Sequence, residues 1–243
     1  MIQSVQRDDT GTPSVSIILI VRDGAAYIAE ALDSVFQSML KPREILVIDG
    51  GSTDATASIA AQFPLTRVMP QGSSGIANAY NLGIDLAQGE LVAFISHDDL
   101  WQPGKLDLQV EHMRCDPQLQ FTVTMVEHFL EPGMAVPPGF RRELLERPVA
   151  GFIMEALVAR KSVFDRVGRF DPSFKVGEDT DWFARAKDLG VPHAVLPQVL
   201  VRKRVHDANS SLNTANLNAL LLRAMRNSVE RKRQALSTGK VWP

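Results

Sequence analysis

The sequence predicts an α/β fold in which a Rossmann-like, mostly parallel sheet is flanked by helices. Runs such as Val15–Val21, 44–48 and 91–95 are apolar at nearly every position, which is typical of strands covered on both faces. Between them lie stretches with apolar residues at helical spacing. Strands that alternate with helices in this way indicate a doubly wound parallel sheet with right-handed crossovers.

The first half of the chain supplies the elements of this sheet in a regular order. Short polar turns containing glycine or proline separate them. We expect strand 15–21, helix 26–37, strand 44–48, a helix ending at Ala61 that Ser52 or Thr53 caps, strand 66–69, helix 76–87 and strand 91–95.

The second half is less regular. We expect a helix over 103–113, a strand over 121–126, an apolar run over 152–159 that contains Glu155, a helix from Glu178 that Gly190 ends, a strand from Val201 and a helical tail from Asn213. The segment 130–148 is rich in proline and charge, and is either a solvated insertion or a lid. Glu155 either contacts a hydroxyl of a bound molecule or faces water from an edge strand.

Composition excludes several classes of protein. The chain of 243 residues is 45% hydrophobic and 22% charged, as ordinary globular proteins are, and its net charge of -2 gives no reason to expect nucleic-acid binding. The single cysteine, Cys115, excludes an internal disulfide and is compatible with a reducing cytosol. Residues 1–13 are polar, and no apolar run approaches the ~20 residues of a membrane span. We expect a soluble cytoplasmic protein, at most peripheral to the inner face of a membrane.

Acidic residues stand where predicted strands end. Asp98 and Asp99 directly follow strand 91–95, and Asp49 begins the turn Asp49-Gly50-Gly51-Ser52-Thr53-Asp54 after the strand before it. Open α/β sheets bind ligands at the carboxyl ends of their strands. Two adjacent carboxylates there suit a divalent cation, whereas the alternative is that they cap the helix that begins near Pro103. Asp49 either accepts hydrogen bonds from a nucleoside or only stabilises its turn.

The second half carries two further polar clusters. Glu178, Asp179 and Asp181 lie at the start of a predicted helix, where the helix dipole favours acids but does not require so many. We expect Asp181 to face solvent or hold the loop. His206 follows a basic strand on which Arg202 and Arg204 share one face, directed either at phosphate or at solvent.

Three pieces of the first half, taken in order, resemble the inverting glycosyltransferases of family 2, which have the GT-A fold. They are Val15–Val21 with its helix, Ile48-Asp49-Gly50-Gly51-Ser52-Thr53-Asp54, and Gly75-Ile76 through Asn81-Leu82-Gly83-Ile84 and Gly89-Glu90 to Asp98-Asp99. The Glu178-Asp179 pair and the His206-Asp207-Ala208-Asn209-Ser210 loop resemble later parts of the family pattern. The resemblance implies a GT-A type sheet with a small mixed acceptor-side sheet and a C-terminal helix.

The resemblance also implies roles for single residues. It implies that Asp99, supported by Asp98 and His206, holds Mn²⁺ or Mg²⁺ against a diphosphate, and that Asp179 is the general base. It implies that the nucleotide sugar is bound by Val21, Asp23, Asp49, Gly75, Asn78, His97 and Asp98. The chain departs from the family pattern where Gly50 replaces a second aspartate and where His97 replaces the first acid of the DxD motif.

The sequence therefore predicts an enzyme that transfers a sugar, with inversion, from a UDP-linked or similar donor to an acceptor hydroxyl. The alternatives are a nucleotidyltransferase and a non-catalytic nucleotide-binding module, although the Gly-x-Gly-x-x-Gly dinucleotide fingerprint is absent. We expect one domain over 1–243, with a nucleotide-sugar-binding half at about 14–115, an acceptor and catalytic half at about 116–212 and a helical tail at about 213–243. The tail is a basic, amphipathic helix that suggests packing on the domain, a homodimer contact or a membrane surface.

Overall fold

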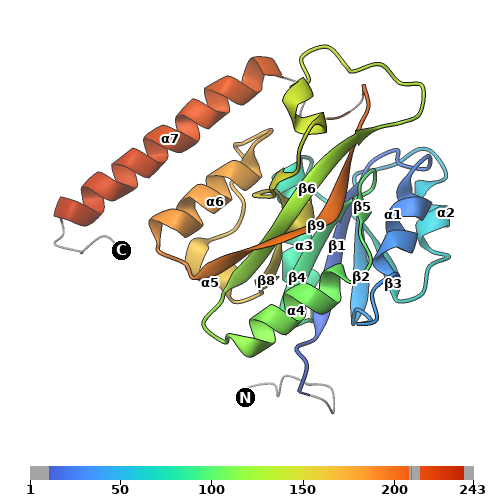
Figure 1. Ribbon diagram of the computed structural model, residues 1–243, viewed down its shortest axis with the longest axis horizontal. Helices are drawn as coiled ribbons and strands as arrows, with labels where there is room; N and C mark the ends of the chain where they lie inside the picture. The colour runs from blue at the N-terminus through green and yellow to red at the C-terminus, as the bar shows by residue number, and fades with distance from the viewer. Residues whose placement is uncertain (1–10, 208, 210–213, 238–243) are drawn as a thin grey trace.

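The computed structural model describes residues 11–207, 209 and 214–237, and a nine-stranded sheet is its central feature (Figure 1). The strand order is β3-β2-β1-β4-β8-β6-β9-β5, with β7 paired to β6. The strands are β1 (Val15–Val21), β2 (Glu44–Asp49), β3 (Thr66–Pro70), β4 (Leu91–Ser96), β5 (Leu100–Trp101), β6 (Phe121–Leu130), β7 (Val149–Ala150), β8 (Val158–Arg160) and β9 (His193–Val205).

Helices flank this sheet. Figure 1 shows α6 and α7 side by side on one flank, and α1 and α2 together on the other. The helices are α1 (Ile28–Val35), α2 (Thr56–Ala60), α3 (Ile76–Leu86), α4 (Lys105–Cys115), α5 (Val163–Val167), α6 (Glu178–Asp188) and α7 (Thr214–Ser237), with short 3-10 turns η1 (Arg142–Leu145) and η2 (Met154–Ala156). The part of the chain that the structure describes contains no helix with the length and apolarity that a membrane crossing needs.

The first half has the predicted parallel arrangement. β1 lies between β2 and β4 and is parallel to both, and β3 continues the sheet beyond β2. β1 has the bounds that the apolar run predicts, and the other strands and helices of this half lie within a few residues of their predicted positions. The carboxyl ends of β1, β2 and β4 therefore meet at one edge of the sheet.

The second half is mixed, and the sequence predicts it less well. β8 is antiparallel to both β4 and β6, whereas β6 and β9 are parallel and shift register around Met125. The apolar run at 152–159 is not one strand: it forms η2 and then β8. β5 was not expected, and it pairs with β9 immediately after Asp98 and Asp99.

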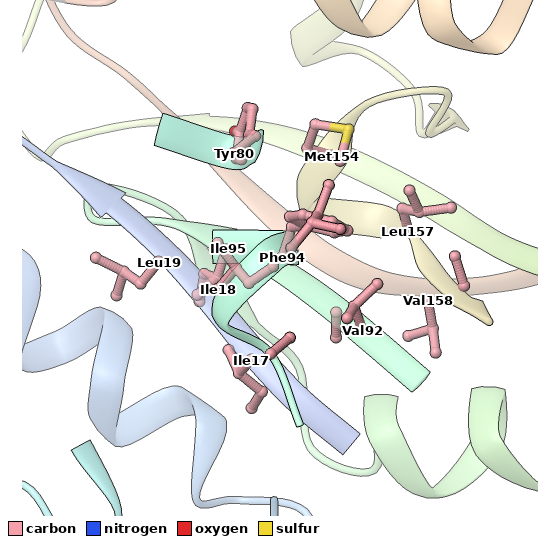
Figure 2. Packing of buried hydrophobic residues seen from close by; sticks show 14 of the residues in the cluster. Ile17, Ile18, Leu19, Tyr80, Val92, Phe94, Ile95, Met154, Leu157 and Val158 are labelled. Atoms are coloured by element: carbon pink, nitrogen blue, oxygen red, sulfur yellow. The ribbon is translucent and has the colours of Figure 1, made fainter. Parts of the chain in front are cut away.

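One hydrophobic cluster draws on both halves. In Figure 2, side chains of β1 and β4, such as Ile18 and Phe94, pack with Met154, Leu157 and Val158 from the second half. Tyr80 of α3 meets Phe94 edge to face, with ring centroids 5.5 Å apart. α3 lies close to β1 because Gly83 has no side chain: a Cβ there would be 2.5 Å from Cγ2 of Ile18.

Two predicted helix caps are wrong. α2 begins at Thr56 without a side-chain cap, because Ser52 and Thr53 make hydrogen bonds to Asp49 and Asp23 instead. α4 begins after Gly104, whose φ is 78°, also without a side-chain cap. The second predicted cap, in which Asp98 and Asp99 cap α4, is therefore wrong.

The C-terminal helix packs with only part of its predicted apolar stripe. Among its described side chains Ala224 is buried, whereas Met225 and Val229 are 66% and 48% exposed; the side chain of Leu217 lies outside the described residues. The helix is fixed mainly by polar contacts to α6, since Ser228 and Arg231 both donate to Asp188. The basic residue Arg231 of this helix therefore forms an ion pair with the buried Asp188.

Candidate active site

The candidate site lies where the carboxyl end of β4 meets the carboxyl end of β9 and the start of α6. β4 delivers Asp98 and Asp99, and β9 delivers Lys203 and His206. Because β5 pairs with β9 directly after the two aspartates, the turn that carries them is held between two parts of the sheet. The predicted position of the site at the strand ends is consistent with this geometry.

Asp99 is completely buried, and β9 occupies both of its oxygens. Lys203 donates to Oδ2 at 2.7 Å, and the backbone N–H of Arg204 donates to Oδ1 at 2.9 Å. Burial raises the pKa of Asp99 to about 7, although the charge of Lys203 opposes this shift. Asp99 thus fastens the turn to β9, and each of its oxygens accepts one hydrogen bond from that strand.

Asp98 points the other way, toward His206. Its Oδ2 is 3.0 Å from Nε2 of His206 and accepts a hydrogen bond of 3.3 Å from Asn209. Burial opposes ionisation of Asp98, but the bond to His206 and the charges of His97 and Lys203 hold its pKa below the usual range. The imidazole of His206 also stacks on Tyr27, with ring centroids 5.3 Å apart. Ser210, the last residue of the predicted loop motif, lies outside the described residues.

The Asp98–His206 pair fits a divalent cation. A carboxylate oxygen is a ligand that Mn²⁺ and Mg²⁺ prefer, and an imidazole nitrogen is a ligand for first-row transition metal ions. Neighbouring ligands of an octahedral cation with bonds of about 2.1 Å lie roughly 3 Å apart, which matches the 3.0 Å between Oδ2 and Nε2. Among the described residues, no group of three or more His, Cys, Asp or Glu is arranged around a metal position. The pair therefore suits a cation whose other ligands are substrate oxygens and water.

Lys203 and Glu155 occupy the middle of the site. Besides Asp99, the ammonium of Lys203 contacts Oε1 of Glu155 at 3.5 Å, and the same oxygen accepts a hydrogen bond from Ser96. Glu155 lies in η2 and is only 6% exposed, so its expected alternative as a water-facing edge charge is wrong. The pKa of Lys203 is above its usual range because the carboxylates of Asp99, Glu155 and Asp98 outweigh the effect of burial.

Glu178 and Asp179 form the acidic side of the site at the start of α6. Burial raises the pKa of Glu178 to about 8, and the charge of Asp179 adds to this shift. Burial also raises the pKa of Asp179 to about 6, against a hydrogen bond from the N–H of Thr180. Oε2 of Glu178 is buried and has no hydrogen-bond partner among the described residues.

Tyr80 shows that these acids gather in one place. Burial raises its pKa, and the charges of Glu155, Glu178 and Asp179 raise it further. Asp181, by contrast, is directed away from the cluster. It is 3% exposed and pairs with Arg185 at 2.8 Å, and Arg185 in turn donates to the carbonyls of Val167 and Arg169. The expectation that Asp181 faces solvent is wrong, whereas the expectation that it holds a loop is confirmed.

The predicted nucleoside side is a network of turns at the ends of β1 and β2. Oδ1 of Asp23 accepts from the N–H of Thr53, and Oδ1 of Asp49 accepts from Ser52. Asp23 has a φ of 50°, which this bond helps to hold. The side chain of Val21 is 6% exposed, so Val21 offers mainly its backbone, and its carbonyl accepts from Gly50.

The remaining predicted residues surround this network. His97 lies between Gly24 and Asp98: its Nδ1 is 4.0 Å from Oδ1 of Asp98, and a Cβ on Gly24 would be 2.5 Å from its Cδ2. Gly75 and Asn78 lie at the start of α3, where Asn78 donates to the carbonyl of Ser74.

Arg202 and Arg204, which the sequence leaves facing either phosphate or solvent, both form ion pairs with glutamates on their face of β9. Arg204 is 4% exposed and donates to the backbone carbonyl of Asp98 and to Glu30, and it also pairs with Glu131. Arg202 pairs with Glu127. Lys203, between them on the other face, is the cation that enters the site. The alternation of side chains along a strand could have pointed to it, had the inward face been known.

Comparison with known proteins places these features in a family. Residues 16–169 match the family model described as glycosyl transferase family 2. An uncharacterized glycosyltransferase of Rickettsia typhi is 30% identical over 228 residues, which cover 86% of this chain and 69% of that protein. The chondroitin synthase of Escherichia coli is 23% identical over 214 residues, which cover 84% of this chain and 31% of the synthase.

Solved structures of S. aureus TarS are among those with the same fold. The structure of TarS 1-349 in complex with UDP-GlcNAc matches with a TM-score of 0.69 at 17% identity, over 90% of this chain and 66% of that one. The complex with UDP matches with a TM-score of 0.61 at 20% identity, over 79% of this chain and 60% of that one. The chain thus spans less than two thirds of each of these solved chains, and at such identity the likeness concerns the fold.

Proposed function

Because the chain belongs to glycosyltransferase family 2 and has the GT-A type α/β fold, we propose that it transfers a sugar from a UDP-linked donor to an acceptor hydroxyl, with inversion at the anomeric carbon. Family membership favours this reaction over nucleotidyl transfer and over a non-catalytic nucleotide-binding role. The known ligands of the TarS structures, UDP and UDP-GlcNAc, support the choice of uridine.

One observation supports the proposal: the contacts of Lys203 with Asp99 and Glu155 connect the Asp98–His206 pair to the Glu178–Asp179 pair. Lys203 touches Asp99 beside the first pair, and its charge lowers the pKa of Asp179 in the second. Glycosyl transfer needs both parts. One side neutralises the departing diphosphate, and the other accepts a proton from the attacking hydroxyl.

In this proposal Asp179 is the general base. Its carboxylate takes the proton of the acceptor hydroxyl as the hydroxyl oxygen attacks the anomeric carbon. The bond from that carbon to the diphosphate oxygen breaks, and the diphosphate leaves with the electron pair. Since the base and the leaving group stand on opposite sides of the sugar, the anomeric configuration inverts. A pKa of about 6 suits this role, because the base is then ionised at neutral pH and still accepts a proton.

The metal assignment changes from the one that the sequence suggests. We assign the direct protein ligands of Mn²⁺ or Mg²⁺ to Asp98 and His206, while Asp99 positions the turn from behind through Lys203 and Arg204. A cation bound there would neutralise charge on the diphosphate leaving group as a Lewis acid. Asn209 donates to Asp98 and so fixes the carboxylate that the cation would use.

Binding and turnover experiments test the proposal. Calorimetry with UDP, GDP and NAD, with and without Mn²⁺, should show metal-dependent binding of UDP. Asp98→Asn should weaken that binding by roughly 100-fold, whereas Asp99→Asn should weaken it far less. Asp179→Asn should keep donor binding and lower turnover by about 10²- to 10⁴-fold. Binding of NAD instead of UDP would refute the proposed reaction, and equal effects of the two aspartate variants would refute the metal assignment.

A further inference from the structure

Lys203 has contacts that differ from those of its neighbours on β9. Arg202 and Arg204 both lie against Phe129, and both are paired with glutamates outside the site. Lys203 instead reaches Asp99 at 2.7 Å and Glu155 at 3.5 Å, and its side chain keeps 22% of its surface exposed. An ammonium group has three N–H donors. The hydrogen bond to Asp99 uses one of them and the ion pair with Glu155 engages at most a second, so the described contacts leave at least one for a molecule that enters the site.

The position of Lys203 indicates which part of a donor it would meet. Its ammonium group is 2.7 Å from Asp99, the chain neighbour of Asp98 on the metal side, and 3.5 Å from Glu155, whose charge acts on Asp179 on the side of the base. In the proposed function, which this inference takes as its premise, the diphosphate lies at Asp98 and the acceptor hydroxyl at Asp179. The transferred sugar must lie between the diphosphate and the acceptor hydroxyl, and Lys203 lies beside that position.

The surroundings of Lys203 favour a neutral partner over an anionic one. Its positive charge is already balanced by Asp99, which is fully buried, and by Glu155, which is 6% exposed. An additional anionic group would find little positive charge here that these two carboxylates do not already balance. A sugar hydroxyl accepts a hydrogen bond from the ammonium group without requiring net positive charge.

We infer that Lys203 is a specificity-determining residue that donates its remaining N–H to a hydroxyl of the transferred sugar, and that Glu155 positions it. Glu155 is suited to this role because its Oε1 is itself fixed by Ser96. A rigid, ion-paired donor rejects a sugar that lacks the hydroxyl or carries it in the other configuration, because the donor is then left without a partner.

The test separates binding of the sugar from binding of the nucleotide. The affinities of UDP and of UDP-GlcNAc are measured by calorimetry with Mn²⁺, and their ratio gives the contribution of the sugar. For the wild-type protein this ratio should favour UDP-GlcNAc. Lys203→Met should lower it by roughly 10- to 100-fold, which is the usual value of one hydrogen bond to a charged group, and should weaken UDP binding far less than UDP-GlcNAc binding. Kinetically the loss should appear in KM for the donor sugar.

Two further variants keep the result interpretable if Lys203→Met folds poorly because Asp99 is left buried and unpaired. The double variant Lys203→Met with Asp99→Asn removes both charges and should show the same loss relative to Asp99→Asn alone. Arg202→Gln removes the same charge from the opposite face of β9 and should leave the ratio unchanged. Thermal unfolding confirms that each variant is folded at the temperature of the measurement.

Each outcome has a separate meaning. A parallel loss of UDP and UDP-GlcNAc affinity in folded Lys203→Met would overturn the inference, since Lys203 would then contact the diphosphate or serve the fold alone. An unchanged ratio would overturn it as well. If the wild-type protein bound neither UDP nor UDP-GlcNAc in the presence of Mn²⁺, the proposed function itself would fail before Lys203 came into question.

Discussion

Glu178 gives a stability prediction that can be worked out from the structure. The side chain is 6% exposed, and its Oε2 has no hydrogen-bond partner among the described residues. Burial and the charge of Asp179 raise its pKa from 4.5 to about 8. Between these two pH values the folded protein keeps the proton, whereas the unfolded chain releases it. Stability must therefore fall as the pH rises, by about 1.4 kcal/mol per pH unit from this group alone.

Glu178→Gln removes this dependence, because the amide is neutral at every pH and has nearly the shape of the protonated acid. Below pH 4.5 the variant and the wild-type protein should be about equally stable. A pH of 7 lies 2.5 pH units above 4.5, so ionisation of Glu178 in the unfolded chain lowers the free energy of unfolding of the wild-type protein by roughly 3 kcal/mol at this pH. The variant should be more stable than the wild-type protein by about that amount. Asp179 titrates in both proteins and cancels in the comparison.

Urea unfolding at pH 5, 6, 7 and 8 measures the difference. The midpoint should separate progressively between the two proteins, with m unchanged. Glu146→Gln makes the same chemical change at an exposed position and should leave the pH dependence as it is. A Glu178→Gln protein that is no more stable than wild type at pH 7, or a gap that does not widen with pH, would refute the reasoning. The expected result would mean that the site retains a destabilising acid next to the proposed base, Asp179.

Three further predictions concern the base and the packing around the site. The value of kcat/KM should rise with pH through about 6 as Asp179 ionises, and a pH–rate profile without that rise would exclude it as the base. Gly83→Ala should cost about 1–3 kcal/mol in urea unfolding, because its Cβ would be 2.5 Å from Ile18, whereas Gly72→Ala, with open space around it, should cost almost nothing. Asn81→Leu should cost about 3 kcal/mol, because Asn81 exchanges two hydrogen bonds of 2.9 Å with the backbone of Phe170; an unchanged midpoint would count against this clamp.

The first half of the fold could be predicted because its strands are buried on both faces. A strand such as β1 must be apolar at nearly every position, so its bounds are visible in the sequence itself. The same argument fails in the second half. β5 is two residues long, and η2 interrupts a run that reads as a strand, since Glu155 turns into the site and not to water. Such short elements are stabilised by partners far along the chain, which a local pattern does not contain.

The roles of Asp98 and Asp99 show where sequence reasoning ends. Both residues follow the same strand, and either one could in principle face the ligand. The structure decides through the pairing of β5 with β9, in which Leu100 lies opposite Arg202. In this register Asp99 receives the N–H of Arg204 and the ammonium of Lys203, and Asp98 is left facing His206. Because side chains alternate along a strand, a shift of one residue would exchange the inward and outward faces. The same register directs Lys203, and not its arginine neighbours, into the site. The proposed metal ligand and the residue proposed to contact the sugar are therefore fixed together by one short strand pairing.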